Sequence, residues 1–258
     1  MTLGPGPCAP GQASGTDRLL PRSIDSGDGE TSSTTALTVS IAPDPHSLPT
    51  LAWPSPTIYA DWLTDSLARC PSGWLARRFY RDPRPHFASF EETLAALALG
   101  ADDRLLEIGC GGGVLLKRAL RHAGSAKAID HSAEMVALTS ERNAEAIAAG
   151  RLMVEQAEAE RLPFANGEFT AALTNVFFFL YEPERVLGEL HRVLASGGRL
   201  AIHTDAPGLP PWMAPITRRM RFYDDAQLVQ LLVAAGFSHA TVPRTADGRG
   251  QPATARRP

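Results

Sequence analysis

This chain of 258 residues has few cysteines, no long apolar run and only a small net charge. Its three cysteines, Cys8, Cys70 and Cys110, are widely separated and form no C-x-x-C pair, which argues against a disulfide framework and a zinc site. No apolar run approaches the roughly 18 residues that span a bilayer, and the first residues lack a signal-peptide pattern. A net charge of -3 offers no general attraction to nucleic acid or anionic membranes. We therefore expect a cytoplasmic protein with no membrane insertion and no nucleic-acid partner.

Large apolar residues are also rare before residue 53. Residues 1–52 are rich in Gly, Pro, Ser and Thr, so we expect a disordered extension; sequence read from a misassigned translation start would have the same composition. Aromatic residues and helix formers then predict a helical cap segment over 53–100. With 44% hydrophobic residues in the chain, residues 101–258 can form one α/β domain.

Short apolar segments alternate with helical segments from residue 104 onward, which is typical of a mostly parallel sheet with helices on both faces. We expect strands at 104–108, 126–129, 152–155, 170–174, 199–203, 238–242 and 251–255. Helices are expected at 112–122, 132–150, 183–194 and 224–236. The last strand contains Pro252, which cannot donate to a ladder, so we expect this edge of the sheet to be irregular or partly unformed.

A glycine-rich turn follows the first strand. Gly109, Gly111 and Gly113 stand at alternate positions, and glycine accepts positive φ and lets a ligand approach the backbone. A dinucleotide fingerprint would place its third glycine at Val114, and Glu107 would repel a pyrophosphate. The turn therefore predicts a nucleoside cofactor with a cationic part. A nicotinamide oxidoreductase remains a less favoured alternative.

Polar residues follow the next three strands, and the carboxyl ends of parallel strands meet at one edge of a sheet. Asp130 is placed to accept hydrogen bonds from both hydroxyls of a ribose. Its alternative role, as the N-cap of the next helix, is one that Ser132 already fills. Glu158 could accept a hydrogen bond from the exocyclic amine of an adenine, or it could lie in a solvated loop. Asn175 follows the fourth strand.

These motifs, together with Ile129-Asp130-His131-Ser132, Glu158-Ala159-Glu160, Leu162-Pro163-Phe164 and Gly197-Gly198-Arg199-Leu200, resemble the class I S-adenosylmethionine-dependent methyltransferases. The similarity is to the small-molecule branch that includes the ubiquinone and menaquinone methyltransferases, and it covers about residues 100–240. It implies a Rossmann-like seven-stranded sheet with an antiparallel last strand, S-adenosylmethionine as cofactor and S-adenosylhomocysteine as product. Glu107 and the glycine turn would face the methionine part of the cofactor, Asp130 the ribose and Glu158 the adenine amine. The cofactor-binding residues implied in this way are Glu107, Gly109, Cys110, Gly111, Gly113, Asp130, His131, Ala157, Glu158 and Asn175. The family usually has Asp where this chain has Glu158 and Thr170.

The methyl acceptor is less clearly marked. The segment 175–178 lacks both prolines of the Asn-Pro-Pro-Tyr motif of amino-methyltransferases, so we infer no amine acceptor from it. The short connection after the fifth strand favours a small organic acceptor with an O, N or C nucleophile. The expected acceptor-binding residues are Phe177, Tyr181, Trp212 and Tyr223, although part of the aromatic run can equally be core.

Methyl transfer from a sulfonium mainly requires alignment in a dry pocket, so a dedicated base is optional. His203, Tyr181 and His86 are weak candidates for one, because a single histidine at a strand end is more often structural. No metal site is expected. The absence of an obvious base leaves one further alternative, a cofactor-binding module or regulator without turnover.

Overall fold

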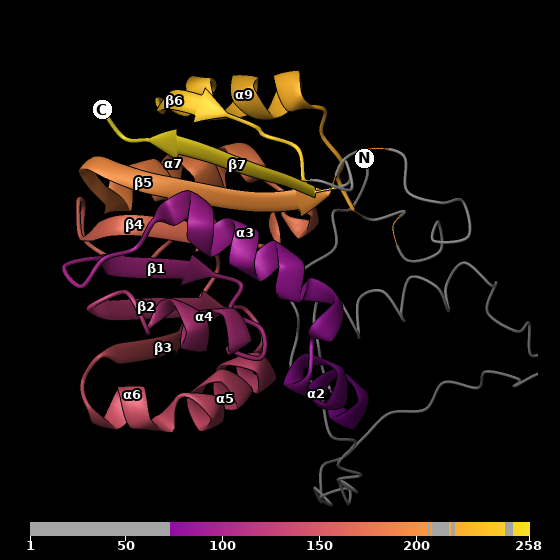
Figure 1. Cartoon of the computed structure of the whole chain (residues 1–258), viewed down its shortest axis with the longest axis vertical. Coiled ribbons are helices and arrows are strands. Elements are labelled where there is room, and N and C mark those ends of the chain that lie inside the picture. The colour runs from indigo at the N-terminus through magenta and orange to yellow at the C-terminus, as the bar shows by residue number, and fades with distance from the viewer. Residues whose placement is uncertain (1–72, 206, 208–216, 218–219, 246–249) are drawn as a thin grey trace, which may run out of the picture. The chain divides into compact units, whose positions relative to one another are not determined.

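A seven-stranded sheet forms the centre of the described chain, which comprises residues 73–205, 207, 217, 220–245 and 250–258 of a computed structural model. The strand order is β3-β2-β1-β4-β5-β7-β6 (Figure 1). The strands are β1 (Arg104–Ile108), β2 (Ser125–Asp130), β3 (Leu152–Gln156), β4 (Phe169–Thr174), β5 (Leu194–Asp205), β6 (Ser238–Thr241) and β7 (Gly250–Arg256). All neighbouring pairs are parallel except those that β7 makes with β5 and β6. The predicted α/β fold and its antiparallel last strand are confirmed.

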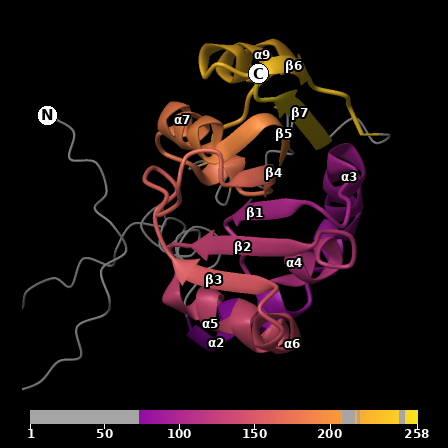
Figure 2. The same ribbon diagram turned by 90° about the vertical axis from the view of Figure 1, so that its left-hand side faces the viewer.

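Helices cover both faces of the sheet. They are α2 (Gly73–Arg81), α3 (Phe87–Leu97), α4 (Val114–Ala119), α5 (Ala133–Arg142), α6 (Ala144–Ala148), α7 (Pro183–Val193) and α9 (Asp225–Ala234), with short 3-10 turns η2 (Arg84–His86) and η3 (Phe177–Phe179). Figure 2 shows α3 and α4 on one side of the strands and α7 on the other. No helix within the described ranges is long and apolar enough to cross a membrane.

Alternating apolar residues divide the core into two layers. Leu105 faces the layer that also contains Leu97 of α3 and Leu116 of α4, whereas Leu106 faces the layer that contains Leu190 of α7 and Leu228 of α9. All six side chains are essentially inaccessible to solvent, since none is more than 1% exposed. Burial on both faces explains why the parallel strands read as apolar runs.

Two helix predictions differ from the structure. The helix expected over 132–150 is divided into α5 and α6 at Asn143, whose side chain donates hydrogen bonds to the carbonyls of Gly113 (3.2 Å) and Thr139 (2.9 Å). The helix expected over 112–122 is only Val114–Ala119. Ser132 does cap α5, because its hydroxyl accepts the N–H of Met135.

The expectation of a partly unformed last strand was wrong, whereas the expected irregularity is present at this edge, where the register of β6 against β7 shifts between Ser238 and Thr241. Strand β7 extends from Gly250 to Arg256, lies inside the sheet, and pairs Pro252 with His203 of β5. Within the described residues, β6 meets β7 only around Thr254 and Arg256, so Pro252 lies beyond the part of β7 that has a second neighbour. A missing N–H can be tolerated where one side of the strand has no ladder. Strand β5 is also longer than predicted, since it begins at Leu194.

The sheet has one topological switch point, where β1 lies between β2 and β4. The chain proceeds outward from β1 to β3 and then returns to β4 on the other side. Ligands of open α/β sheets bind outside the carboxyl ends of the strands at such a point. The turns after β1, β2 and β4 are therefore the place to look for a site.

Candidate functional site

The glycine turn after β1 adopts the predicted conformation. Gly109, Gly111 and Gly113 have φ values of 74°, 52° and 69°, in the region that L side chains rarely adopt. A Cβ on Gly109 would lie 2.3 Å from a methyl carbon of Val176, and one on Gly113 would lie 2.6 Å from the Asn143 amide. Backbone shape and close packing both require glycine at these positions.

Asp130 holds this turn from the end of β2. Its carboxylate accepts the N–H of Gly111 on one oxygen and the N–H of Ser132 on the other, each at 2.9 Å. A carboxylate has about four acceptor positions, so two remain for a ligand. The predicted ribose contact is therefore compatible with a second, structural role of Asp130 that the sequence did not reveal. His131 Nδ1 lies 3.6 Å from the same carboxylate.

Glu107 is a buried carboxylate with an unsatisfied oxygen. The side chain is 3% exposed, and its Oε2 has no hydrogen-bond partner. Burial, reinforced by the nearby Asp130, raises the pKa of Glu107 well above its ordinary value. Buried polar atoms in folded proteins nearly always have partners, so an unpaired carboxylate oxygen beside a glycine cradle fits a ligand that carries positive charge or N–H donors.

Cys110 lies in the same turn and is buried. Burial raises the pKa of its thiol well above the ordinary value. A thiol held in its neutral form is a poor nucleophile, so Cys110 contributes shape to the turn.

Tyr80 closes the turn from outside, a feature that sequence reasoning missed. Its ring carbons would lie 3.1 Å from a Cβ on Gly111, and its carbonyl oxygen 2.1 Å from a Cβ on Gly112. Burial and the charge of Asp130 raise the pKa of Tyr80. No local pattern around Tyr80 marks it as a site residue, because its position depends on how α2 packs.

Helix α2 is fixed to α5 by charged contacts. Arg77 and Arg81 each form an ion pair with Glu141 of α5, at 3.3 and 3.2 Å. Arg142 donates a hydrogen bond of 2.7 Å to the carbonyl of Arg81. Both ion pairs are substantially exposed, so each contributes at most about 1 kcal/mol. Helix α2 therefore covers the turn, and its ion pairs with α5 stabilise this position only weakly.

The residues expected at the adenine follow β3. Ala157 donates its N–H to the carbonyl of Asp130 at 3.1 Å, which places this segment beside the end of β2. Glu158 is exposed, and its charge contributes to the raised pKa of Asp130, after burial as the main cause. The segment therefore lies at the same edge as the glycine turn.

Asn175 follows β4 and contacts α3. The hydroxyl of Thr93 lies 2.7 Å from the carbonyl of Ser89 and 3.1 Å from the Asn175 amide. A hydroxyl carries one proton, so if the shorter bond uses it, the contact with Asn175 needs the amide N–H as donor. In either orientation one amide atom of Asn175 stays buried without a partner. Asn175 thus presents an unused polar atom at the switch point.

The expected acceptor residues are spread over different environments. Phe177 is fully buried in the core, where its ring centroid lies 5.7 Å from that of Tyr223. Tyr181 is 46% exposed. Trp212 lies outside the described residues. The structure therefore brings Phe177 and Tyr223 together, with Phe177 packed as core.

The three weak base candidates also differ. His203 is 7% exposed and its Nδ1 lies 3.8 Å from Oε2 of Glu92. His86 stacks on Phe90, with ring centroids 6.3 Å apart, and Tyr181 is exposed. His203 is thus the candidate with a buried position and an acidic neighbour. Among the described residues, no group of three or more His, Cys, Asp and Glu could hold a metal ion.

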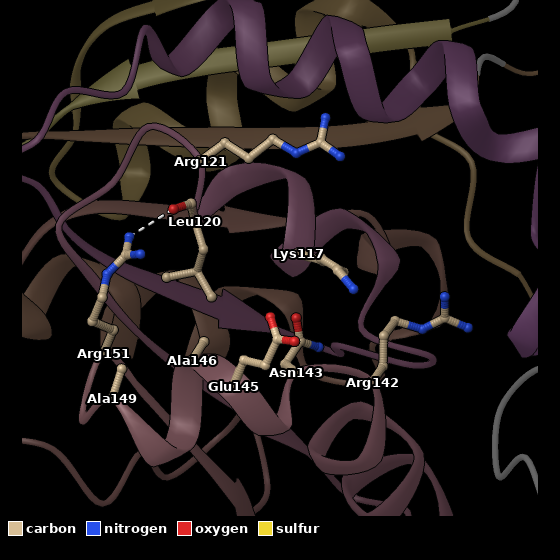
Figure 3. Close-up of a pocket in the computed structure, with 9 residues that line it drawn as sticks. All are labelled: Lys117, Leu120, Arg121, Arg142, Asn143, Glu145, Ala146, Ala149 and Arg151. Carbon is tan, nitrogen blue, oxygen red and sulfur yellow. Dashed lines mark hydrogen bonds between the residues drawn. The ribbon is translucent and has the colours of Figure 1, made fainter.

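A separate basic cavity of about 220 Å³ lies between α4 and the α5–α6 segment (Figure 3). Its charged lining residues are Lys117, Arg121, Arg142, Glu145 and Arg151. Arg151 donates hydrogen bonds to the carbonyls of Leu120 and Ala123, which stabilises the end of α4. None of the predicted cofactor residues lines this cavity, so it is distinct from the edge described above.

Comparison with known proteins agrees with this geometry. Residues 106–202 match the family model described as "Methyltransferase domain". The chain is 32% identical over 144 residues to a malonyl-[acyl-carrier protein] O-methyltransferase of Herminiimonas arsenicoxydans, covering 52% of each protein. It is 33% identical over 120 residues to a ubiquinone/menaquinone biosynthesis C-methyltransferase of Geobacter sp. strain M21, covering 44% of this chain and 51% of that protein. The matches span about half the length of these curated relatives.

Solved structures support the fold. Geranyl diphosphate C-methyltransferase of Streptomyces coelicolor A3(2), in complex with Mg²⁺, geranyl diphosphate and S-adenosyl-L-homocysteine, has a TM-score of 0.58 and 19% identity, covering 73% of this chain and 86% of that one. At this identity the similarity concerns the fold alone.

Proposed function

Since this chain belongs to the class I S-adenosylmethionine-dependent methyltransferases, we propose that it transfers a methyl group from S-adenosylmethionine to a small organic acceptor. The single observation that carries the proposal is the unpaired, buried carboxylate oxygen of Glu107 beside the glycine turn at the switch point. A dipolar nucleoside with cationic groups fits this combination better than a pyrophosphate does, because a carboxylate repels phosphate.

The proposed cofactor contacts follow from the donors and acceptors at the edge. Glu107 binds the cationic end of the cofactor, and the turn 109–113 provides close main-chain approach. Asp130 accepts hydrogen bonds from the ribose hydroxyls at its two remaining acceptor positions. His131, Ala157 and Glu158 lie at the adenine, where Glu158 accepts the exocyclic amine.

The reaction asks little covalent chemistry of the protein. When bound, the cofactor supplies a methyl group on a positively charged sulfur, which is already a good leaving group. Asp130 and the turn fix the position of the donor, while Tyr80 and α2 exclude water from this side of the turn. Tyr181, Trp212 and Tyr223 are the proposed acceptor contacts, and Asn175 is a proposed cofactor contact at the switch point. Alignment of acceptor, methyl group and sulfur in a dry space then provides most of the rate enhancement.

Transfer of a radiolabelled methyl group from S-adenosylmethionine tests the activity. The purified full chain is incubated with panels of phenols, enols, carboxylic acids and amines, and the product is recovered by extraction. Labelled product that depends on Glu107 supports the proposal. Tight binding of S-adenosylhomocysteine with no transfer across the panel would instead favour the binding module without turnover, and binding of NADH in its place would favour the oxidoreductase.

A further inference from the structure

Helix α3 faces the carboxyl ends of two neighbouring strands with two consecutive polar side chains. Thr93 contacts the Asn175 amide at 3.1 Å, and Glu92 lies 3.8 Å from Nδ1 of His203. In the register of the sheet, Thr174 of β4 pairs with Ile202 of β5, so the residues that follow, Asn175 and His203, are also neighbours. Helix α3 therefore connects the candidate base to the polar residue at the switch point.

The imidazole of His203 is confined on several sides. The residue is 7% exposed. Strand β7 approaches it closely, because a Cβ on Gly250 would lie 3.0 Å from its Cε1. Glu92 limits the ring on the side of α3. A ring held in this way has a defined orientation, which a base requires and an exposed histidine lacks.

Several charged groups surround this position. Asp205 lies two residues further along β5, on the same face of the strand, and its charge acts on His86 of η2. Glu91 points elsewhere on α3, since it forms an ion pair with Arg118 of α4. Of the acidic groups on α3, Glu92 is thus the one that faces His203, and it is the one placed to stabilise an imidazolium there.

We propose that His203 is the catalytic base that takes the proton from the acceptor nucleophile, and that Glu92 is the positioning residue that orients the imidazole and stabilises its protonated form. The inference rests on the proposed methyl transfer. The separation of 3.8 Å between Nδ1 and Glu92 is an ion-pair distance, and in the tautomer that carries its proton on Nδ1 the imidazole keeps a lone pair on Nε2 for the acceptor. The acceptor is then a compound whose nucleophile carries a proton of moderate acidity, such as a phenol or an enol.

The proton and electron balance of this step is simple. The acceptor O–H bond breaks, its proton passes to Nε2 of His203, and its electron pair forms the new O–CH₃ bond. The C–S bond breaks with its electron pair going to sulfur, which becomes neutral in S-adenosylhomocysteine. The imidazolium is paired with Glu92 until it releases the proton to water. No oxidant, reductant or metal is consumed.

The test compares Glu92→Gln, Glu92→Asp and His203→Gln with Glu91→Gln, a matched control on the same helix. The first measurement is the pKa of His203, followed by the Cε1–H signal of protein labelled with ¹³C-histidine and assigned from the His203→Gln spectrum. Removal of a carboxylate within about 4 Å should lower the pKa of His203 by about 1. Glu92→Asp should restore part of this change, and Glu91→Gln should leave the pKa as in the wild type.

The second measurement is the pH profile of labelled methyl transfer to the best phenol or enol of the panel. His203→Gln should lower kcat by about 100-fold or more. Glu92→Gln should move the acid limb of the profile to lower pH by about 1, with KM for S-adenosylmethionine unchanged. A shift of that limb is not expected if Glu92 acts only in folding, which circular dichroism checks for each variant.

The two hypotheses fail differently. If the wild type binds no S-adenosylhomocysteine by calorimetry, the proposed function fails. If the wild type binds it but the pKa of His203 is the same in Glu92→Gln and in the wild type, the pairing of Glu92 with His203 is overturned, whether or not an acceptor has been found. An unchanged kcat in His203→Gln with an active acceptor would overturn the role of His203 as base.

Discussion

Replacement of Glu107 by Gln separates the charge of this side chain from its shape. In the wild type, burial raises the pKa of the carboxyl, which favours its protonated form in the ligand-free protein. A cationic cofactor favours the charged carboxylate. Binding of S-adenosylmethionine should therefore release a proton from Glu107, and the affinity should rise with pH up to the raised pKa. The Glu107→Gln variant has no proton to release at this position, so its affinity should not depend on pH in this way.

The size of the effect follows from the hydrogen bond that the unpaired Oε2 would form. A buried hydrogen bond to a charged group contributes about 1.5–3 kcal/mol. Loss of the charge should weaken binding of S-adenosylmethionine by roughly 10- to 150-fold where the wild-type carboxylate is ionised in the complex. The difference in affinity between the two proteins should be smaller at pH values where Glu107 of the wild type must lose its proton before it can bind the cofactor.

The stability of the ligand-free wild type should fall as pH rises, whereas its affinity for the cofactor rises. Because the pKa of Glu107 is raised in the folded state, the favourable contribution of the protonated carboxyl is complete below the pKa of the unfolded chain, about 4.3. It is lost as pH rises through the raised value. Glu107→Gln has no such loss, so it should unfold at the higher urea concentration at alkaline pH.

Calorimetry in buffers of different ionisation enthalpy measures the released protons directly. For the wild type we expect cofactor binding to release protons at pH values below the raised pKa of Glu107, and we expect a smaller release for Glu107→Gln. Equal proton release and equal affinity in the two proteins would refute the assignment of Glu107 to the cofactor site.

Three further substitutions and one control test the surroundings of the site. Asp130→Ala should weaken cofactor binding by about 1–3 kcal/mol through the lost ribose contact; an unchanged dissociation constant would place Asp130 outside the site. Gly112→Ala puts a Cβ 2.1 Å from the Tyr80 carbonyl oxygen and should destabilise the fold by about 1–3 kcal/mol in urea titrations. As a control, Gly188→Ala, with nothing within 4 Å of its Cβ, should be neutral or stabilise α7 by up to about 1 kcal/mol. Similar urea midpoints for the two variants would contradict the close packing of α2. Phe177→Ala should cost about 3–5 kcal/mol of unfolding free energy, since the side chain is fully buried; a small loss would instead indicate an accessible pocket wall.

Local signals made much of this fold predictable. The glycine turn, the N-cap at Ser132, the capping box at Asp224 and the proline that begins α7 are determined by residues close together in sequence. Each has a mechanism that acts within a few residues. The ends of β1 were correct for the same reason, and β2 is only one residue longer at each end than predicted. These strands placed the predicted cofactor residues at one edge of the sheet.

Features that depend on distant contacts were not predictable in this way. Tyr80 reaches the glycine turn only because α2 packs on α5, and Glu92 reaches His203 only because α3 crosses β5. The break at Asn143 depends on a carbonyl of Gly113, thirty positions earlier in the chain. The position of Pro252 inside the sheet depends on how short β6 is. Spacing along a sequence does not contain these distances.

Isothermal titration of the folded full chain with S-adenosylhomocysteine tests the central claim most directly. We expect saturable binding at a single site, with a dissociation constant that Asp130→Ala raises by roughly 5- to 150-fold. Absence of binding heat at any temperature tried, with circular dichroism showing a folded wild type, would contradict the assignment of this edge of the sheet to S-adenosylmethionine.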